Sequence, residues 1–241
     1  MPKKFEKEFI SYCEIQNLEV NPNQIKVIKK LDDYHNSNYK SFFSKLFSKQ
    51  KTKKGFYLYG GVGVGKTMIL NFFYDHLEEK KLKKHFNEFM LGFHDFVHEQ
   101  KEKNEENVIN QFVKNLKSKA SLIYFDEFQV TNIVDAMILG KLFEQIFKED
   151  IKIILTSNTK ISELYKEGLQ REQFIPFIKI MEDQSIEYEL KIEDDYRKSN
   201  DNQKQRYFFP LNQETNFKIN KFFRTITTVS YTHLTLPTKP F

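Results

Sequence analysis

The chain has 241 residues and a net charge of +5, with 39% hydrophobic and 15% aromatic residues. This composition excludes an intrinsically disordered protein, and so small a basic excess does not by itself assign a nucleic-acid or membrane partner. The single cysteine, Cys13, excludes an internal disulfide and a zinc site of several cysteines. No apolar run approaches the roughly 18 residues of a membrane span, and no targeting segment is recognisable, so we expect a cytoplasmic protein.

The chain begins with a polar, lysine-rich stretch over residues 1–53, in which Ile25, Ile28 and Leu31 recur at helical spacing. We expect a helical N-terminal extension there. Residues 54–198 then alternate short apolar runs with amphipathic stretches. Strands are predicted at residues 56–59, 85–89, 122–125, 151–156 and 185–192. The last of these alternates apolar residues with Glu187, Glu189 and Lys191, which is typical of an edge strand with one wet face.

The helices predicted between these strands each have one apolar face. Their apolar positions are Ile69, Leu70, Phe73 and Leu77, then Val108, Ile109, Phe112 and Leu116, then Ile133, Ala136, Met137, Gly140, Phe143 and Phe147. Alternating strands and helices predict an α/β fold, a three-layer αβα sandwich around a mostly parallel five-stranded sheet.

The end of the chain differs in composition from the rest. Residues 199–228 are expected to form an incomplete C-terminal region. Residues 229–241, VSYTHLTLPTKPF, depart from a body rich in lysine, asparagine, isoleucine and phenylalanine, and they resemble a translated sequencing-adapter tail. We expect this tail to be foreign to the protein, whose natural chain would run on further.

Five of the eight glycines lie between Gly55 and Gly65, where the sequence matches the phosphate-loop pattern G-x-x-x-x-G-K-[ST]. The pattern follows a predicted strand and precedes a predicted helix, as it must if backbone N–H groups and the helix N-terminus are to surround phosphate oxygens. The predicted nucleotide-binding residues are Gly60, Gly61, Val62, Gly63, Val64, Gly65, Lys66, Thr67 and Met68. The fold is therefore expected to be that of a P-loop NTPase.

Two acidic residues follow the apolar run Leu122 to Phe125, about 60 residues after the loop. In a P-loop enzyme Lys66 contacts the β- and γ-phosphates of ATP, while Thr67 ligates Mg²⁺ and Asp126 holds the ion through water. Glu127 is predicted to orient and deprotonate the attacking water. An Asp-Glu pair favours ATP hydrolysis over simple nucleotide binding.

A third polar group is expected at the end of the strand predicted at 151–156. Asn158, or as a second choice Thr156, would position the water against the γ-phosphate. Only four of the 38 basic residues are arginines, and an arginine that contacts phosphate at two points cannot be replaced by lysine without loss. Arg171 is therefore our candidate for an arginine finger acting on the ATP of a neighbouring subunit, with Arg197 as a weaker one.

Longer phrases carry a family resemblance over residues 55–224. The phrases are GFYLYGGVGVGKTMILNFFYD, KKHFNEFMLGFH, SLIYFDEFQVTNIVDAMILGKLFEQIF, ILTSN, LYKEGLQREQFIPFI, DYR and YFFPL. Together they resemble the ZapE cell-division ATPases of bacteria and their mitochondrial AFG-like relatives, in the AAA+ class. The resemblance implies ATP and Mg²⁺, a ring that we expect to be hexameric, and action on a protein client. In bacteria it implies association with the tubulin-like division ring at the inner membrane, and nucleic acid is not expected as a partner.

The sequence departs from this family in two places. Asn87 stands where the family usually has histidine, which puts any role of that position in doubt. The helical lid that follows in relatives is expected to be truncated here, which leaves open whether this chain hydrolyses ATP as well as it binds it.

Other interpretations remain open. A helicase-loader-like module that binds nucleic acid under the control of ATP would share the same loop, acids and sensor, and a scaffold with a degenerate site is a third possibility. A GTPase is disfavoured because no N-K-x-D motif follows the loop. His94 and His98 share one helical face and weakly suggest a metal site, and the lysine runs 51–54 and 80–84 offer weak contacts for phosphates or anionic lipid.

Overall fold

The computed structural model describes residues 4–39, 52–100 and 105–191. All of them belong to the first of two units, residues 1–195. In chain order the elements are α1 (Lys4–Ile15), α2 (Pro22–Tyr39), β1 (Gly55–Tyr59), α4 (Lys66–Asp75), β2 (Lys81–His85), α5 (Phe86–Glu99), α6 (Glu105–Lys119), β3 (Leu122–Asp126), α7 (Ile133–Lys148), β4 (Lys152–Ser157), η1 (Ile161–Glu163), η2 (Arg171–Gln173), α8 (Ile175–Gln184) and β5 (Ser185–Glu189). The predicted region 199–228, the tail from residue 229 and Arg197 lie outside the described residues.

Five strands form one sheet in the order β2-β3-β4-β1-β5, and every neighbouring pair is parallel. The predicted five-stranded parallel sheet is therefore confirmed. Because β4 lies between β1 and β3, the carboxyl ends of these three strands meet at one edge of the sheet.

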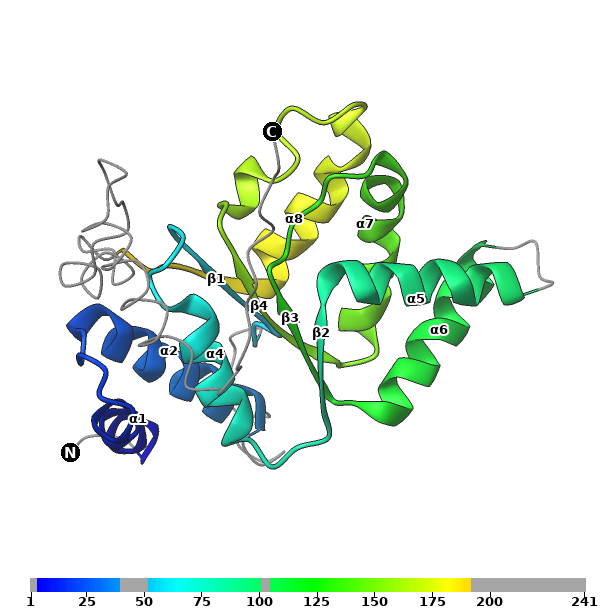
Figure 1. Ribbon diagram of the computed structural model, residues 1–241. Helices are drawn as coiled ribbons and strands as arrows, with labels where there is room; N and C mark the ends of the chain where they lie inside the picture. The colour runs from blue at the N-terminus through cyan, green and yellow to red at the C-terminus, as the bar shows by residue number, and fades with distance from the viewer. Residues whose placement is uncertain (1–3, 40–51, 101–104, 192–241) are drawn as a thin grey trace, which may run out of the picture. The chain divides into compact units, whose positions relative to one another are not determined.

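Alternating side chains of the strands fill two separate cores. Phe56 and Leu58 pack with α1, α2 and α4, whereas Tyr57 between them packs on the opposite face with α5, α6, α7 and α8. Figure 1 shows these layers, with the blue and cyan helices on one side of the sheet and the green and yellow helices on the other. The structure is thus the predicted αβα sandwich.

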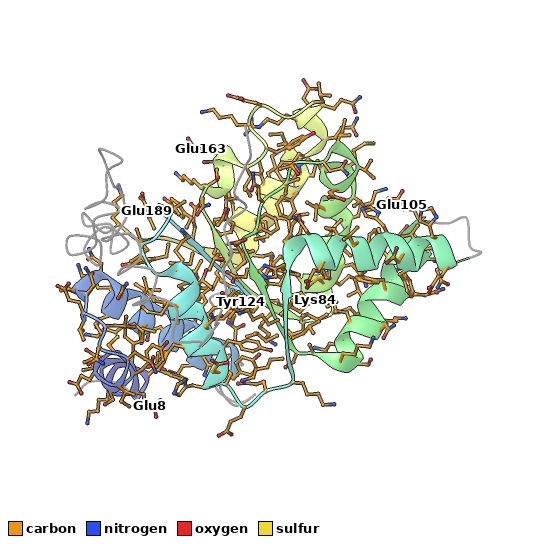
Figure 2. All side chains as sticks on the ribbon, in the orientation of Figure 1. Glu8, Lys84, Glu105, Tyr124, Glu163 and Glu189 are labelled. Atoms are coloured by element: carbon orange, nitrogen blue, oxygen red, sulfur yellow. The ribbon has the colours of Figure 1, made fainter. Side chains whose placement is uncertain are left out.

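The second strand was predicted wrongly at residues 85–89. The strand is β2, Lys81–His85, and Phe86 already begins α5. Its apolar residues Phe86, Phe89, Met90 and Phe93 recur at helical spacing and are buried on one helix face. The lysine-rich β2 is an edge strand, seen in Figure 2 at Lys84, and edge strands tolerate charged side chains that discourage pairing with other chains.

The last strand confirms the predicted edge position, because among the described strands β5 pairs with β1 alone. It ends at Glu189, so the predicted extension to residue 192 is wrong for Leu190 and Lys191, and residue 192 lies outside the described residues. In α7, Met137 was expected on the apolar face but is 50% exposed. Leu139, Phe143 and Ile146 define the buried face. Two helical residues turn the direction by about 200°, which places Met137 opposite Leu139.

The N-terminal residues form two helices that share a core with the sheet. Ile28 and Leu31 of α2 are fully buried, as is Cys13 of α1, and burial raises the pKa of its thiol. The boundary predicted at residue 53 remains a prediction. Among the described residues, none of the helices combines the length and the apolar character needed to cross a bilayer.

Candidate functional site

The candidate site lies where β1, β4 and β3 end. Residues 60–65 follow β1, Asp126 is the last residue of β3, and Asn158 follows β4. In an open parallel sheet, ligands bind outside the carboxyl ends of the strands at the point where the strand order reverses. Here the connection after β1 leads to β2 at one edge of the sheet, and the connection after the neighbouring β4 leads to β5 at the other edge, so the loop lies at such a reversal.

The loop at residues 60–65 has a backbone that demands glycine. Gly60, Gly63 and Gly65 have φ angles of 154°, 86° and 91°, a region that other residues rarely adopt. A Cβ on Gly60 would lie 2.4 Å from the carbonyl oxygen of Leu190, and one on Gly65 would lie 2.7 Å from Nε2 of Gln24. At these two positions glycine is needed because Leu190 and Gln24 pack closely on the loop. This reason for glycine is additional to the close approach of a phosphate, which the sequence predicted.

The two valines of the loop have opposite surroundings. Val64 is 6% exposed and belongs to the core beneath α4, whereas Val62 is 57% exposed at the tip. Val64 thus anchors the loop. Helix α4 begins directly afterwards at Lys66, with Gly65 as a cap that has no side chain to satisfy the first N–H groups. Such a helix N-terminus attracts anions.

Lys66 is held at the mouth of the loop and is 8% exposed. Its Nζ donates to the carbonyl oxygens of Gly60 and Gly61 at 2.8 and 2.7 Å and to Oδ1 of Asn158 at 2.9 Å. The structure therefore brings together Lys66 and Asn158, which are 92 residues apart in the chain.

One carboxylate oxygen of Asp126 accepts three hydroxyl hydrogen bonds. Oδ1 lies 3.0 Å from Oγ1 of Thr67, 2.7 Å from Oγ1 of Thr156 and 3.1 Å from the hydroxyl of Tyr124. Burial, and then the negative charge of Asp126, raise the pKa of Tyr124, so this phenol stays a donor. Tyr124, labelled in Figure 2, comes from the face of the sheet that packs against α4.

Glu127 follows in a left-handed conformation, with φ of 56°, and is exposed. Its backbone N–H donates to Oγ1 of Thr156 at 2.9 Å. The Thr156 hydroxyl therefore connects the two predicted acids. Thr156 was our second choice for the group beside the γ-phosphate; it is 1% exposed and contacts the acids, whereas Asn158 contacts Lys66.

The turns around the site are fixed by further hydrogen bonds. Oγ of Ser157 donates to the carbonyl of Phe128 at 2.9 Å, and the hydroxyl of Tyr57 donates to the carbonyl of Thr159 at 2.6 Å. The N–H of Ile161 donates to Oε1 of Glu187 at 2.7 Å. The segment that carries Asn158 is thus tied to both β3 and the edge strand β5.

Arg171 lies apart from this cluster in the short helix η2. Its Nη2 donates to the carbonyl of Ser162 at 2.9 Å, and its Nε is buried without a hydrogen-bond partner among the described residues. The structure joins it neither to Lys66 nor to Asp126 in the interactions it records for this part of the chain. Its role as an arginine finger remains a prediction.

The sequence did not predict the contacts of three residues of the site, Tyr124, Thr156 and Gln24. Tyr124 stands two positions before Asp126 in a strand, so period-two alternation places both on one face and could have revealed it. For Thr156 only its place in the next strand was a signal, and Gln24, whose amide contacts the loop, carried none.

The weak metal signal at His94 has another explanation. His94 Nε2 lies 2.7 Å from Oδ1 of Asp135, a hydrogen-bond contact between α5 and α7. Within residues 4–39, 52–100 and 105–191, no group of three histidine, cysteine, aspartate or glutamate side chains is placed to hold a metal ion.

The residues of the site fit a nucleotide with Mg²⁺. Hydroxyl and carboxylate oxygens are the ligands that Mg²⁺ prefers, usually with retained water and substrate phosphates. Thr67 and Asp126 place one of each within 3.0 Å, directly beside an open helix N-terminus.

Comparisons with known proteins agree with this arrangement. A family model for AFG1-like ATPases matches residues 12–236. The chain is 40% identical over 161 residues to lactation elevated protein 1 homolog B of Danio rerio, covering 63% of this chain and 32% of that protein. It is 34% identical over 183 residues to the cell division protein ZapE of Escherichia coli, covering 73% and 48% respectively. The chain thus spans about a third to a half of the length of these curated relatives.

Solved structures support the fold alone. Domain III of the replication initiation protein DnaA of Thermotoga maritima has a TM-score of 0.51 at 17% identity, covering 76% of this chain and 69% of that one. AMPPCP-bound DnaA from Aquifex aeolicus has a TM-score of 0.50 at 16% identity, covering 88% and 64%. With the family model covering most of the chain, the resemblance found in the sequence is confirmed: the chain belongs to the AFG1-like ATPase family.

Proposed function

We propose that this protein hydrolyses ATP in a Mg²⁺-dependent reaction, as an oligomeric AAA+ ATPase of the ZapE type that remodels a protein assembly. The observation that carries the proposal is the 3.0 Å contact between Thr67 and Asp126, which joins the phosphate loop to the acidic strand across 59 residues of sequence. The loop follows β1 and Asp126 ends β3, and in the sheet β4 alone lies between these two strands, so the loop and Asp126 come close together.

The loop residues 60–65 and the first turn of α4 would bind the phosphates, with Met68 at the base of the loop. Lys66 would exchange the carbonyls of Gly60 and Gly61 for oxygens of the β- and γ-phosphates. Thr67 and Asp126 would hold Mg²⁺, which neutralises charge developing on the phosphate oxygens.

Glu127 would act as the general base. Its side chain is exposed at the end of β3, while its backbone is fixed by Thr156. A carboxylate held at a fixed backbone position can orient a water and accept its proton. Asn158, already bonded to Lys66, would align that water with the γ-phosphate.

Assembly would complete the site. Arg171 would reach the ATP of a neighbouring subunit in a ring, which we expect to be a hexamer. The Escherichia coli relative is named a cell division protein, which supports a client in the division apparatus, with the tubulin-like division protein as our candidate. We place the action in the cytoplasm, with peripheral association at the inner membrane.

The test is the ATPase rate per subunit measured against protein concentration, for wild type and Arg171→Ala. We expect the wild-type rate to rise steeply with concentration and Arg171→Ala to bind ATP normally while losing this assembly-dependent hydrolysis. Mixing the two proteins should restore activity at sites where a wild-type subunit supplies the arginine. A rate independent of concentration in both proteins would contradict action across subunits.

A second measurement addresses the helicase-loader alternative. We expect no binding to single-stranded DNA at low salt. An affinity that falls steeply as salt is added would instead support a nucleic-acid partner.

A further inference from the structure

The first turn of α2 lies directly against the phosphate loop. Gln24 is 2% exposed, and its Nε2 donates to the carbonyl oxygen of Val64 at 3.0 Å, across 40 residues of sequence. The same nitrogen occupies the space that a Cβ of Gly65 would need. Gln24 thus contacts Val64 and Gly65, the last two residues of the loop before Lys66.

The neighbouring residue, Asn23, reaches the other side of the loop. Its Nδ2 donates to the carbonyl of Lys191 at 2.9 Å. The adjacent Leu190 donates its N–H to the carbonyl of Tyr59 at 2.8 Å, and its own carbonyl packs on Gly60. The start of α2 and the segment after β5 therefore hold the loop at both ends.

The side-chain amide of Gln24 uses its donor nitrogen but not its acceptor oxygen. Its Oε1 is buried without a partner among the described residues. A buried acceptor without a partner costs free energy, and this cost offsets the stability that the bond to the Val64 carbonyl contributes. The amide is better explained by the conformation that its N–H group imposes on the loop.

We propose that Gln24 is a positioning residue that holds residues 60–65 in the nucleotide-binding conformation, so that α2 is coupled to the occupancy of the site. This inference rests on the proposed ATP binding. If the loop adopts its binding conformation only part of the time, the apparent dissociation constant for nucleotide equals the intrinsic constant divided by the fraction of molecules in that conformation. By reciprocity, bound nucleotide stabilises the docking of α2 on the loop.

The experiment compares wild type with Gln24→Met, which keeps the length and volume of the side chain and removes both the donor and the buried acceptor. We expect the dissociation constant for a non-hydrolysable ATP analogue to rise about fivefold, as for the loss of one hydrogen bond. The melting temperature without nucleotide should change little, because removal of the unsatisfied oxygen offsets the loss of the bond to the buried Val64 carbonyl. The value of KM should rise more than kcat falls.

A second variant and a control make the result specific. Gln24→Glu keeps the shape but places a carboxylate oxygen against the Val64 carbonyl, so its loss of affinity should exceed that of Gln24→Met. Gln16→Met, at an exposed position between α1 and α2, should bind like wild type. Amide hydrogen exchange over residues 22–31 should slow when wild type binds the analogue and slow less in Gln24→Met.

The outcomes separate the two proposals. If wild type does not bind the analogue at all, the proposed function fails and this inference fails with it. If wild type binds and both Gln24 variants bind within twofold of it, ATP binding stands and the positioning role is overturned. A lower melting temperature with unchanged affinity would also overturn it, since Gln24 would then serve stability alone.

Discussion

Strands β1 and β4 have a polar cluster at each end, and the two clusters use their charges differently. At the amino ends, Asp150 accepts from Lys54 at 3.1 Å and from Lys152 at 2.7 Å. At the carboxyl ends, Asp126 is surrounded by hydroxyl groups, Lys66 by oxygen acceptors without charge, and Glu127 stays exposed.

We call the cluster at Asp150, where opposite charges pair with each other, the structural end of the sheet. The cluster at Lys66 and Asp126, where we propose that the nucleotide binds, is its chemical end. Opposite charges that pair with each other, as at Asp150, hold segments together and leave little charge for a ligand. At the other end Lys66 and Asp126 form hydrogen bonds with neutral groups, beside an open helix N-terminus. That arrangement suits a ligand that brings its own charge.

The largest expected effect comes from Glu127→Gln at the chemical end. Turnover should fall about 100- to 10,000-fold, the usual contribution of a general base, while ATP still binds. Because Glu127 is exposed, the free energy of unfolding should change by less than about 0.5 kcal/mol. The measurement is single-turnover ATP hydrolysis beside equilibrium nucleotide binding.

The companion variant is Lys66→Ala, which should abolish nucleotide binding itself. If Glu127→Gln hydrolysed ATP as fast as wild type, the assignment of the base would be wrong. If both variants merely lowered stability, the contrast between the two ends of the sheet would disappear.

An intermediate effect is expected for Thr156→Val, which preserves shape and removes the hydroxyl that connects Asp126 to the backbone of Glu127. Turnover should fall by about tenfold to 100-fold, since small misplacements of reacting groups have effects of this size. The protein should also lose about 1–3 kcal/mol of stability from unsatisfied buried groups. Thr159→Val, three residues on, is the control, and equal rates in the two variants would refute the connecting role.

The smallest effect is expected for Asp150→Asn at the structural end. Burial alone raises the pKa of Asp150, but hydrogen bonds and charges from Lys152 and then Lys54 outweigh it and hold the pKa below its usual value. A lowered pKa in the folded state stabilises above the unfolded pKa, near about 4, and this stabilisation is lost as the pH falls through the folded value.

The loss in Asp150→Asn should therefore be largest near neutral pH, at about 1 kcal/mol for a pair in which Asp150 is exposed and Lys152 is buried, and should shrink below about pH 4. Asparagine tolerates the left-handed backbone at this position, where φ is 56°. Denaturant unfolding at pH 7 and pH 3 measures this, and ATP hydrolysis should be unchanged. A drop in hydrolysis would mean that the two ends are coupled.

Much of the fold followed from local spacing. The phosphate loop is a contiguous pattern, and the acids Asp126 and Glu127 stand directly after an apolar run, so both could be located without knowing the strand order. The edge strand β5 was recognised because its charges alternate. The strand β2 was missed because four of its five residues are lysine or histidine, a composition that only an edge position accommodates.

The contacts within the site were less accessible. Choosing between Thr156 and Asn158 required the direction of each side chain at the end of β4, which the run of residues 151–158 leaves undecided. No periodicity connects Gln24 with Val64, because the pairing arises from where α2 packs. Arg171 was selected by the rarity of arginine, and its partner across a ring stays a prediction.

The sequence by itself determined the phosphate loop, the paired acids and the two apolar faces of each layer, because these depend on neighbours a few residues apart. Only the tertiary structure decided that Thr67 and Thr156 meet at one oxygen of Asp126 and that Gln24 meets the loop. These contacts join residues 30 to 59 positions apart. They form because the strand order places β4 between β1 and β3, and because buried polar groups must find partners wherever packing brings them.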